Sequence, residues 1–330
     1  MKILYIFSGF PGIYYFFDNF IINELNNEDH ICKGFNHFEG MDSLKLNVLE
    51  FEPDLVFTMT GFILPEQMTE WLKDQKNKLA VWMTEDPYYM DKTVEIINRY
   101  DYIFTIDRAS LEHYQKNGHP HVYLLPLGTD PNTFSPSTHS DEQELIDICL
   151  VGYPYPDRIE LIKFLLKETQ YTIEVVGGKW KDELREWSKD QRLKITDWQP
   201  PHKVVNYYNN AKIILNTHRP QDLVENNNSM GIISKSINNR TFDVASCGAF
   251  QLISHQPDLR YYFSEKEMVS FESQEELIEK IHFYIKNEEK RKEIALNARE
   301  VVLKHHTFAH RIKEIIAIVQ KNNKSKSGPG

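Results

Sequence analysis

The sequence predicts an α/β protein built from two Rossmann-like halves, each a parallel sheet with helices on both faces. Short apolar runs such as Leu79–Met83 and Ile146–Val151 alternate with amphipathic helical patterns along the chain. The alternation stops at the polar, proline-containing segment 135–144 and then starts again, so we interpret that segment as an interdomain linker. The length of 330 residues also exceeds what one hydrophobic core usually supports.

The first half contains the pattern of a complete parallel sheet. Its runs predict strands at 2–7, 54–59, 79–83, 102–106 and 121–125, and helices at 14–26, 65–73, 93–99 and 109–117. Runs that are apolar on both faces are typical of strands buried between two helix layers. We therefore expect a first domain over residues 1–138.

The second half repeats the plan and predicts a second domain over residues 144–307. Its expected strands are 146–151, 172–176, 193–195, 212–215 and 249–253, and its expected helices are 156–166, 182–188, 204–209, 236–247, 275–286 and 288–304. A last helix is expected within 308–322, and the polar residues 323–330 are expected to be a disordered tail.

Composition and charge exclude several classes of protein. Hydrophobic residues make up 41% and charged residues 26%, as in ordinary soluble proteins, and no apolar run approaches the ~20 residues of a membrane helix. The net charge of −10 argues against a dedicated binder of nucleic acid or anionic membranes. The three cysteines are far apart in apolar surroundings, which indicates free thiols and a cytoplasmic location.

The segment 236–254 (SINNRTFDVASCGAFQLIS) carries the most informative polar pattern. If its helix begins at Ser236, helical spacing puts Ser236, Asn239, Arg240 and Asp243 on one face near the N-terminus. Such a face suits a phosphate-bearing ligand, with Arg240 neutralising the phosphate and Asp243 accepting from ribose hydroxyls. The alternative is a solvated helix face with a capping serine and a surface ion pair.

Other polar residues of the second half follow the ends of expected strands, where parallel sheets bind ligands. These are Gly152, Gly177, Asn216 and His218, with Arg158 in the first turn of the next helix. His218 lies among arginines, which disfavours its cation, so we expect a hydrogen-bond donor rather than a metal ligand. For Arg158 and Gly177, a surface charge and a strand-end turn are equally good interpretations.

Two loops of the first half lie at the same kind of position. The SGFPG loop, with Gly9 and Gly12, lacks dinucleotide-binding spacing, so it is either a tight turn or a place where an acceptor approaches the backbone. Glu85 and Asp86 are adjacent carboxylates after the strand at 79–83, and only one of them can face a cleft. Asp86 is our candidate for a base acting on an acceptor hydroxyl, and the alternative is an acidic turn that starts a helix.

Motifs for other chemistries are not apparent. The histidines, cysteines and carboxylates do not fall at metal-site spacing, and neither a Walker loop nor a G-x-S-x-G elbow occurs. The sequence therefore predicts no metal and no bound cofactor.

Several segments together resemble the CgeB-like spore-maturation group of GT-B glycosyltransferases, in the wider region of group 1 transferases. The matching segments include PDLVFTMTG (53–61), LAVWMTEDPYYMD (79–91), AKIILNTHR (211–219), NNRTFDVASCGAFQLIS (238–254) and HTFAHR (306–311). They occur in order over nearly the whole chain, which makes the resemblance specific for the fold and less so for the substrate.

The resemblance implies two facing Rossmann-like domains with the active site between them. The second domain would bind a nucleotide-diphospho-sugar and the first domain an acceptor, and the last helix would cross back onto the first domain. The donor residues implied or supported are Gly152, Arg158, Gly177, Asn216, His218, Ser236, Asn239, Arg240 and Asp243. The acceptor side would include Gly9, Gly12, Glu85 and Asp86.

The chain departs from the group 1 pattern at two positions. The ribose-binding glutamate of that pattern corresponds to Asp243, which is one methylene shorter, and a second glutamate eight residues earlier corresponds to Lys235. Lys235 could instead act with Arg240 in stabilising the departing diphosphate, without a metal. Asp86, Lys235 and Arg240 are thus the candidate catalytic residues.

The predicted function is transfer of a sugar from a nucleotide-diphospho-sugar, UDP by preference, to a hydroxyl acceptor, in spore surface or envelope glycan maturation. Two alternatives stay open. The substitutions at Lys235 and Asp243 would also suit a non-catalytic assembly protein that keeps the nucleotide pocket. A nucleotide-sugar epimerase uses the same two-domain architecture.

Overall fold

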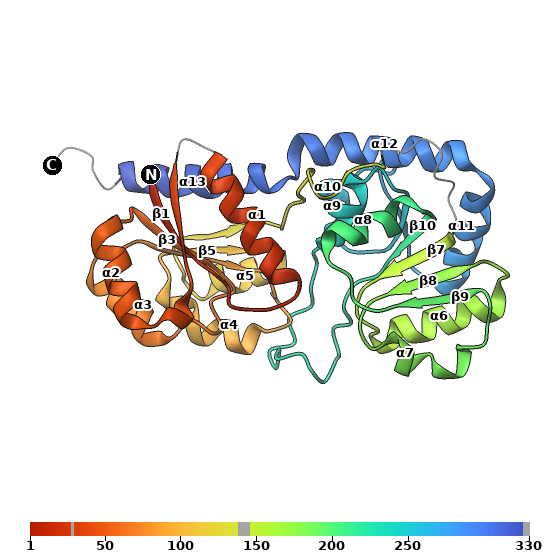
Figure 1. The fold of residues 1–330 in the computed structure, drawn as a ribbon, viewed down its shortest axis with the longest axis horizontal. Coiled ribbons are helices and arrows are strands. Elements are labelled where there is room, and N and C mark those ends of the chain that lie inside the picture. Colours follow the sequence, from red (N-terminus) through yellow and green to blue (C-terminus); the bar gives the residue numbers. More distant parts are fainter. Residues whose placement is uncertain (28–29, 138–145, 326–330) are drawn as a thin grey trace. The chain divides into compact units, whose positions relative to one another are not determined.

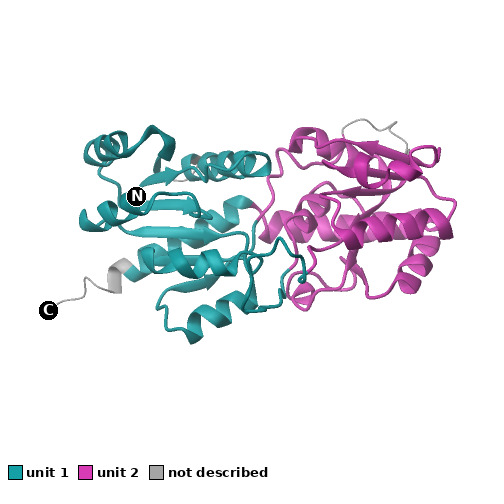
Figure 2. Cartoon of the chain, turned by 90° about the horizontal axis from the view of Figure 1, so that it is seen from below, with its two compact units in different colours: residues 1–127, 221–236, 308–330 teal, residues 128–220, 237–307 magenta. Residues whose placement is uncertain are grey.

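A computed structural model describes residues 1–27, 30–137 and 146–325 of the chain (Figure 1). The chain divides into two compact units, shown in Figure 2. Unit 1 comprises Met1–Leu127, Gln221–Ser236 and Phe308–Gly330, and unit 2 comprises Gly128–Pro220 and Ile237–Thr307. The units differ from the expected domains at 128–138, which belongs to unit 2, and at 221–236, which belongs to unit 1.

Unit 1 is built on one parallel sheet of six strands in the order β2-β1-β3-β4-β5-β6. The strands are β1 (Lys2–Ile6), β2 (Ile31–Phe35), β3 (Leu55–Met59), β4 (Leu79–Met83), β5 (Tyr102–Thr105) and β6 (Val122–Leu124). The helices are α1 (Ile13–Asn27), α2 (Met41–Phe51), α3 (Glu66–Asp74), α4 (Met90–Ile96), α5 (Arg108–Lys116) and α13 (Phe308–Ser325), with short 3-10 turns η1 (His37–Glu39) and η2 (Ile97–Arg99).

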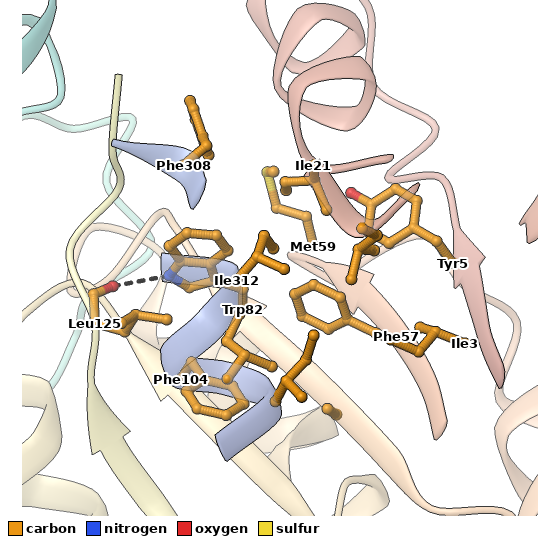
Figure 3. Packing of buried hydrophobic residues seen from close by; sticks show 14 of the residues in the cluster. Ile3, Tyr5, Ile21, Phe57, Met59, Trp82, Phe104, Leu125, Phe308 and Ile312 are labelled. Atoms are coloured by element: carbon orange, nitrogen blue, oxygen red, sulfur yellow. Dashed lines mark hydrogen bonds between the residues drawn. The ribbon is translucent and has the colours of Figure 1, made fainter. Parts of the chain in front are cut away.

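Helices cover both faces of this sheet and bury its apolar side chains. One face packs against α1 and α13, and the other packs against α2, α3, α4 and α5. On the first face Trp82 donates its indole N–H to the carbonyl of Leu125 at 2.8 Å, and Phe308 lies over the same cluster (Figure 3). The aromatic start of α13 therefore packs in the core of unit 1.

Unit 2 also has a parallel six-stranded sheet, in the order β12-β11-β10-β7-β8-β9. The strands are β7 (Ile146–Val151), β8 (Ile173–Val176), β9 (Leu193–Thr196), β10 (Ala211–Asn216), β11 (Gln251–Ser254) and β12 (Val269–Phe271). The helices are α6 (Pro156–Glu168), α7 (Trp180–Glu183), α8 (Pro201–Asn209), α9 (Arg240–Ser246), α10 (Leu259–Tyr262), α11 (Gln274–Lys286) and α12 (Glu288–His305), with a 3-10 turn η3 (Arg185–Trp187).

The core of unit 2 lies in the two layers between this sheet and its helices. Side chains of α6 and α11 pack with Trp180 on one face of the central strands. On the other face α8 and α9 contribute Val204, Tyr208 and Val244. Because the strands β7 and β10 are buried on both sides, their carboxyl ends are held in fixed positions next to each other.

The predicted fold class is confirmed: both units are α/β, with Rossmann-like parallel sheets. Several elements were missed, among them the edge strands β2 and β12 and the helices α2 and α10. Most of the expected linker lies outside the described residues. None of the helices in the described part of the chain combines the length and apolarity needed to cross a membrane.

The expected start of the helix at Ser236 is wrong, because α9 begins at Arg240. Asn238 explains the later start: its side-chain oxygen accepts the backbone N–H of Thr241 at 3.2 Å, which satisfies one of the free donors at the helix start. The predicted stop is confirmed, since Gly248 has the left-handed backbone (φ 64°) of a helix C-terminus.

Candidate functional site

The strand order of unit 2 marks one place on its sheet as the favoured ligand position. Counted from β7, the order is that of dinucleotide-binding Rossmann folds, and the chain reverses direction across the sheet between β7 and β10. Loops that leave neighbouring strands on opposite faces open a crevice at their carboxyl ends. The residues after β7 and β10 are Gly152 and Thr217, so this end of the sheet is where the sequence had placed most donor-site candidates.

Gly152 brings two arginines of unit 2 together at this point. Its backbone has φ 150°, and a Cβ on it would lie 2.7 Å from Nη1 of Arg158 and 2.7 Å from Nη2 of Arg240. Any larger residue would therefore displace guanidinium groups. The two cations reach the loop from different helices, Arg158 from α6 and Arg240 from α9.

Arg158 is only 4% exposed, and backbone and hydroxyl groups hold it in place. Its Nε donates to Oγ1 of Thr217 at 2.9 Å, Nη2 donates to the carbonyl of Thr217 at 2.7 Å, and Nη1 donates to the carbonyl of Tyr153 at 2.8 Å. The ring of Tyr155 lies 4.8 Å from the guanidinium carbon. The expected alternative of a surface charge does not apply to this buried side chain.

Arg240 is oriented by neutral oxygen atoms. Its Nη1 donates to Oδ1 of Asn216 at 2.9 Å and to the carbonyl of Thr217 at 3.4 Å. Asn216 is buried and is fixed in turn by donating to Thr241 and Gln251. Within the described residues Arg240 makes no ion pair, so its positive charge is available for an anion.

His218 lies beside the two arginines with its ring held by Ser254. Nδ1 of His218 is 2.8 Å from Oγ of Ser254, while Nε2 is buried and has no hydrogen-bond partner in the described structure. Burial, with the charges of Arg240 and Arg158, lowers the pKa of His218 to about 3. The imidazole is therefore neutral at physiological pH, as the sequence predicted.

Asp243 lies one helical turn after Asn239 and is 6% exposed. Its Oδ2 accepts from Nδ2 of Asn239 at 2.9 Å, whereas Oδ1 of Asp243 and Oδ1 of Asn239 have no partner among the described residues. Burial raises the pKa of Asp243 to about 8, against the opposing effects of the nearby Thr129 hydroxyl and of the Arg240 charge. A polar ligand that donates hydroxyl groups would complete this pair.

Gly177 supports the site by its packing. A Cβ at Gly177 would lie 2.2 Å from the carbonyl oxygen of Gly152, and the same oxygen accepts the indole N–H of Trp180 at 2.7 Å. The glycine is thus required for the close approach of the loops after β7 and β8. Its position fixes the backbone on which the arginines are arranged.

Two other predicted site residues, Lys235 and Ser236, belong to unit 1. Oδ2 of the buried Asp107 accepts from Oγ of Ser234 at 2.8 Å and from the backbone N–H groups of Lys235 and Ser236 at 2.9 and 3.2 Å. The ammonium group of Lys235 lies 2.8 Å from the carboxylate of Glu112. Lys235 and Ser236 therefore fasten the segment 221–236 to unit 1.

Unit 1 has a cavity of about 510 Å³ after the carboxyl ends of β1, β3 and β4. Its lining includes Phe10, Tyr14, Thr60, Phe62, Glu85 and Tyr89. Tyr14 donates its hydroxyl hydrogen to the carboxylate of Glu85. Thr60 has φ 60°, an uncommon conformation for a β-branched residue, and such strain is concentrated at functional sites.

Asp86 points away from that cavity, into the interior of unit 1. It is 1% exposed and accepts hydrogen bonds from the hydroxyls of Thr93, Thr105 and Tyr114 at 3.1, 2.7 and 2.7 Å. Burial raises its pKa to about 7. Of the two adjacent carboxylates, Glu85 is therefore the one that lines the cavity, the opposite of the preference stated from the sequence.

The two glycines of the first loop differ in their surroundings. A Cβ on Gly9 (φ 77°) would lie 2.4 Å from Cε1 of His37, so this position needs glycine for packing as well as for its backbone. Gly12 has φ 72° and open space around it, which makes it a turn residue. The loop before them is held by Asp18, which accepts from Ser8.

Sequence reasoning missed the residues that orient the site. Thr217 holds Arg158, and Ser254 holds His218. Asn238 donates to Oδ1 of Asn216 and to the carbonyl of Thr217, the two oxygens that accept from Arg240, and Tyr14 contacts Glu85. Thr217 and Ser254 follow or end expected strands, which is the signal that would have identified them. In the described part of the chain, no three His, Cys, Asp or Glu side chains gather as a metal ion would require.

Comparisons with known proteins show the family to which the chain is similar. A family model described as glycosyl transferase-like matches residues 158–317. The chain is 35% identical over 307 residues to Spore protein CgeB of Bacillus subtilis (strain 168), covering 92% of this chain and 94% of that protein.

Solved structures show the same fold at low identity. A sucrose-phosphate synthase from Thermosynechococcus elongatus aligns with a TM-score of 0.70 and 12% identity, covering 98% of this chain and 99% of that chain. Anabaena HepE, solved in complex with UDP and glucose, aligns with a TM-score of 0.69 and 12% identity, covering 97% of this chain and 100% of that chain.

Proposed function

Because the chain belongs to the family of GT-B glycosyltransferases that includes Spore protein CgeB, we propose that it transfers a sugar from a UDP-sugar to a hydroxyl acceptor. The observation that carries the proposal is the pair of guanidinium groups that lie close to Gly152. They lie at the carboxyl ends of β7 and β10, where the reversal in strand order favours a ligand. Their charge suits a diphosphate.

The diphosphate group would bind between Arg158 and Arg240. Arg158 is already fixed by three hydrogen bonds, and Arg240 is fixed by Asn216 and Thr217, so neither side chain has to be ordered on binding. When the bond between the sugar and the diphosphate breaks, negative charge develops on the leaving oxygen. Preorganised guanidinium groups stabilise that charge, and we assign them this role in place of a metal ion.

The nucleoside would bind beside α9. Asp243 and Asn239 each carry a buried oxygen without a hydrogen-bond partner in the described structure, and two ribose hydroxyls could donate to them. The neutral His218 would contribute a donor towards the phosphates. The choice of UDP is supported by the complex of HepE with UDP and glucose, which has the same fold.

The acceptor would bind in the cavity of unit 1. Aromatic rings of Phe62 and Tyr89 form one wall, and the carboxylate of Glu85 lies in the lining. In the transfer step the acceptor oxygen bonds to the sugar carbon, the bond to the diphosphate breaks, and the hydroxyl proton passes to a base. We assign this base to Glu85, since Asp86 is buried among three hydroxyl groups.

The biological setting follows from the same family. We place the transfer in the cytoplasm, where reducing conditions suit the free thiols of Cys32, Cys149 and Cys247. The relationship to Spore protein CgeB supports a role in maturation of the spore surface.

The test compares nucleotide binding by the wild type, Arg240→Ala and Arg185→Ala. Arg185 is the matched control, because it is an arginine of unit 2 whose side chain is 80% exposed and paired with Asp182. At a hundred times its dissociation constant, UDP should stabilise the wild type and Arg185→Ala by about 2.7 kcal/mol in a thermal shift assay. Arg240→Ala should lose most of this shift, and its unliganded melting temperature should fall only slightly.

Turnover with UDP-sugars separates the function from its alternatives. Release of UDP that depends on an added acceptor supports transfer. Tight binding without release under any acceptor would point to a binding protein, and isomerisation of the sugar without release would point to an epimerase. Equal UDP shifts in wild type and Arg240→Ala would refute the assignment of the site.

A further inference from the structure

Ser254, the last residue of β11, contacts His218 twice. Its Oγ accepts the backbone N–H of His218 at 3.3 Å and lies 2.8 Å from Nδ1 of the imidazole. The two residues meet because β10 and β11 are paired neighbours, with Asn216 opposite Ile253. The serine hydroxyl is therefore fixed by the sheet, and it determines the environment of one ring nitrogen.

The number of protons on these groups limits how they can bond. A backbone N–H can only donate, so its contact occupies one lone pair of Oγ and leaves the hydroxyl hydrogen for another acceptor. Among the described residues, the acceptor within reach is Nδ1 of His218. If Nδ1 carried a proton and donated to Oγ instead, the hydroxyl hydrogen of Ser254 would have no partner among the described residues.

A neutral imidazole carries one proton, so an accepting Nδ1 places that proton on Nε2. Nε2 is buried and has no partner in the described structure, and the neighbouring charges are those of Arg158 and Arg240. An N–H in that position is a third donor beside two guanidinium groups. All three groups suit oxygen atoms that carry negative charge.

We propose that Ser254 is a positioning residue that keeps the proton of His218 on Nε2, so that the imidazole donates a hydrogen bond to the diphosphate of the donor substrate. The proposal rests on the proposed function for the identity of the ligand. The position of the proton is a property of the unliganded protein and can be measured separately. Ser254 itself need not touch the substrate.

The opposite tautomer makes a different prediction. With the proton on Nδ1, the lone pair of Nε2 would face the arginines and repel a phosphate oxygen. That arrangement would let His218 accept from a ligand hydroxyl instead. The two tautomers give distinct ¹⁵N shifts and long-range couplings, so one spectrum distinguishes them.

The first measurement is a long-range ¹H–¹⁵N correlation spectrum of the unliganded protein labelled at its histidines. The chain has 13 histidines, and the signal missing from His218→Gln identifies the ring. We expect a protonated Nε2 and an unprotonated Nδ1 in the wild type and in Ser254→Thr, which keeps the hydroxyl. Ser254→Ala should give a mixture of tautomers.

The second measurement is the dissociation constant of UDP by calorimetry. Ser254→Ala should weaken binding about tenfold, as for loss of one hydrogen bond to a charged group, and Ser254→Thr should bind within about twofold of the wild type. Ser270→Ala is the matched control, since Ser270 lies on the neighbouring strand β12 opposite Ile253 and contacts Arg260. It should change neither the tautomer nor the affinity.

A wild-type His218 protonated on Nδ1 would overturn the proposal, as would Ser254→Ala with unchanged tautomer. A changed tautomer with unchanged UDP affinity would overturn the part that concerns the diphosphate. If the wild type bound no UDP at all, the proposed function would fail, and the spectrum would still decide whether Ser254 fixes the proton.

Discussion

The carboxyl ends of the two sheets use charged residues in opposite ways. In unit 1 the carboxylates of Asp86 and Asp107 are buried, and each accepts several hydrogen bonds from its own unit. In unit 2 the guanidinium group of Arg240 is held by neutral oxygens and makes no ion pair with a described residue. A charge that the fold already satisfies stabilises the fold, whereas a charge that it leaves uncompensated can bind a ligand.

The largest expected effect concerns the stability of unit 1. Asp86→Ala removes the acceptor of three buried hydroxyl groups and should lower the free energy of unfolding by roughly 4 kcal/mol. Arg240→Ala should cost about 1 kcal/mol or less, because Thr217 keeps its bonds from Arg158. Urea unfolding, monitored by hydrogen exchange in peptides of each unit, measures the loss of unfolding free energy in both variants. Equal losses of unfolding free energy in the two variants would contradict the difference between the units.

A smaller effect is expected from crowding the arginines. Gly152→Ala puts a Cβ 2.7 Å from each guanidinium and should weaken UDP binding by tenfold or more. Gly178→Ala is the control in the next loop, where a Cβ would meet nothing within 4 Å, and it should bind like the wild type. Calorimetry gives both constants, and unchanged binding by Gly152→Ala would show that the arginines do not hold the nucleotide.

The pH dependence of binding sharpens the assignment of the ribose site. Ribose hydroxyls donate to the ionised carboxylate, and the pKa of Asp243 is about 8 in the unliganded protein. Below that pH a proton must leave before the ligand binds, so affinity for UDP-glucose should fall by up to tenfold for each pH unit between 8 and 6.

Other groups of the proposed nucleotide site should not produce this dependence. His218, with a pKa of about 3, stays neutral over the range, and the diphosphate of UDP-glucose keeps its charge. Asp243→Asn should bind with an affinity that hardly changes with pH. A wild-type affinity that is flat between pH 6 and 8 would remove Asp243 from the ribose site.

The smallest effect is expected at Lys235. Its ion pair with Glu112 joins side chains that are 36% and 56% exposed, and such pairs contribute about 0–1 kcal/mol. Lys235→Ala should therefore reduce the unfolding free energy slightly and leave UDP binding unchanged. A large loss of affinity would instead support the role of Lys235 at the diphosphate, which the resemblance to group 1 transferases had suggested.

These differences show which features the sequence determines locally. The runs Leu79–Met83 and Ile146–Val151 became strands with the predicted bounds, because strands buried on both faces are largely apolar. The partly exposed edge strand β2 (ICKGF) has no such signature and was missed. Because the strands were predicted correctly, the positions of the loops at their ends could be predicted as well. Gly152, Asn216 and His218 were located in this way.

The direction of a side chain within those loops could not be predicted from spacing. Glu85 and Asp86 are adjacent and must diverge, but partners far along the chain, Thr105 and Tyr114, decide that Asp86 is the buried one. Likewise Asp107 accepts hydrogen bonds from the backbone of Lys235 and Ser236, which lie more than a hundred residues later in the sequence. Local patterns contain no information about such partners.

The most direct test of the account is to map the binding of UDP by the shifts of backbone amide signals in the full chain. We expect the perturbed signals to concentrate in unit 2, at Gly152, Gly177, His218 and the start of α9. Perturbations concentrated instead around the cavity of unit 1, at Thr60, Phe62 and Glu85, would contradict it.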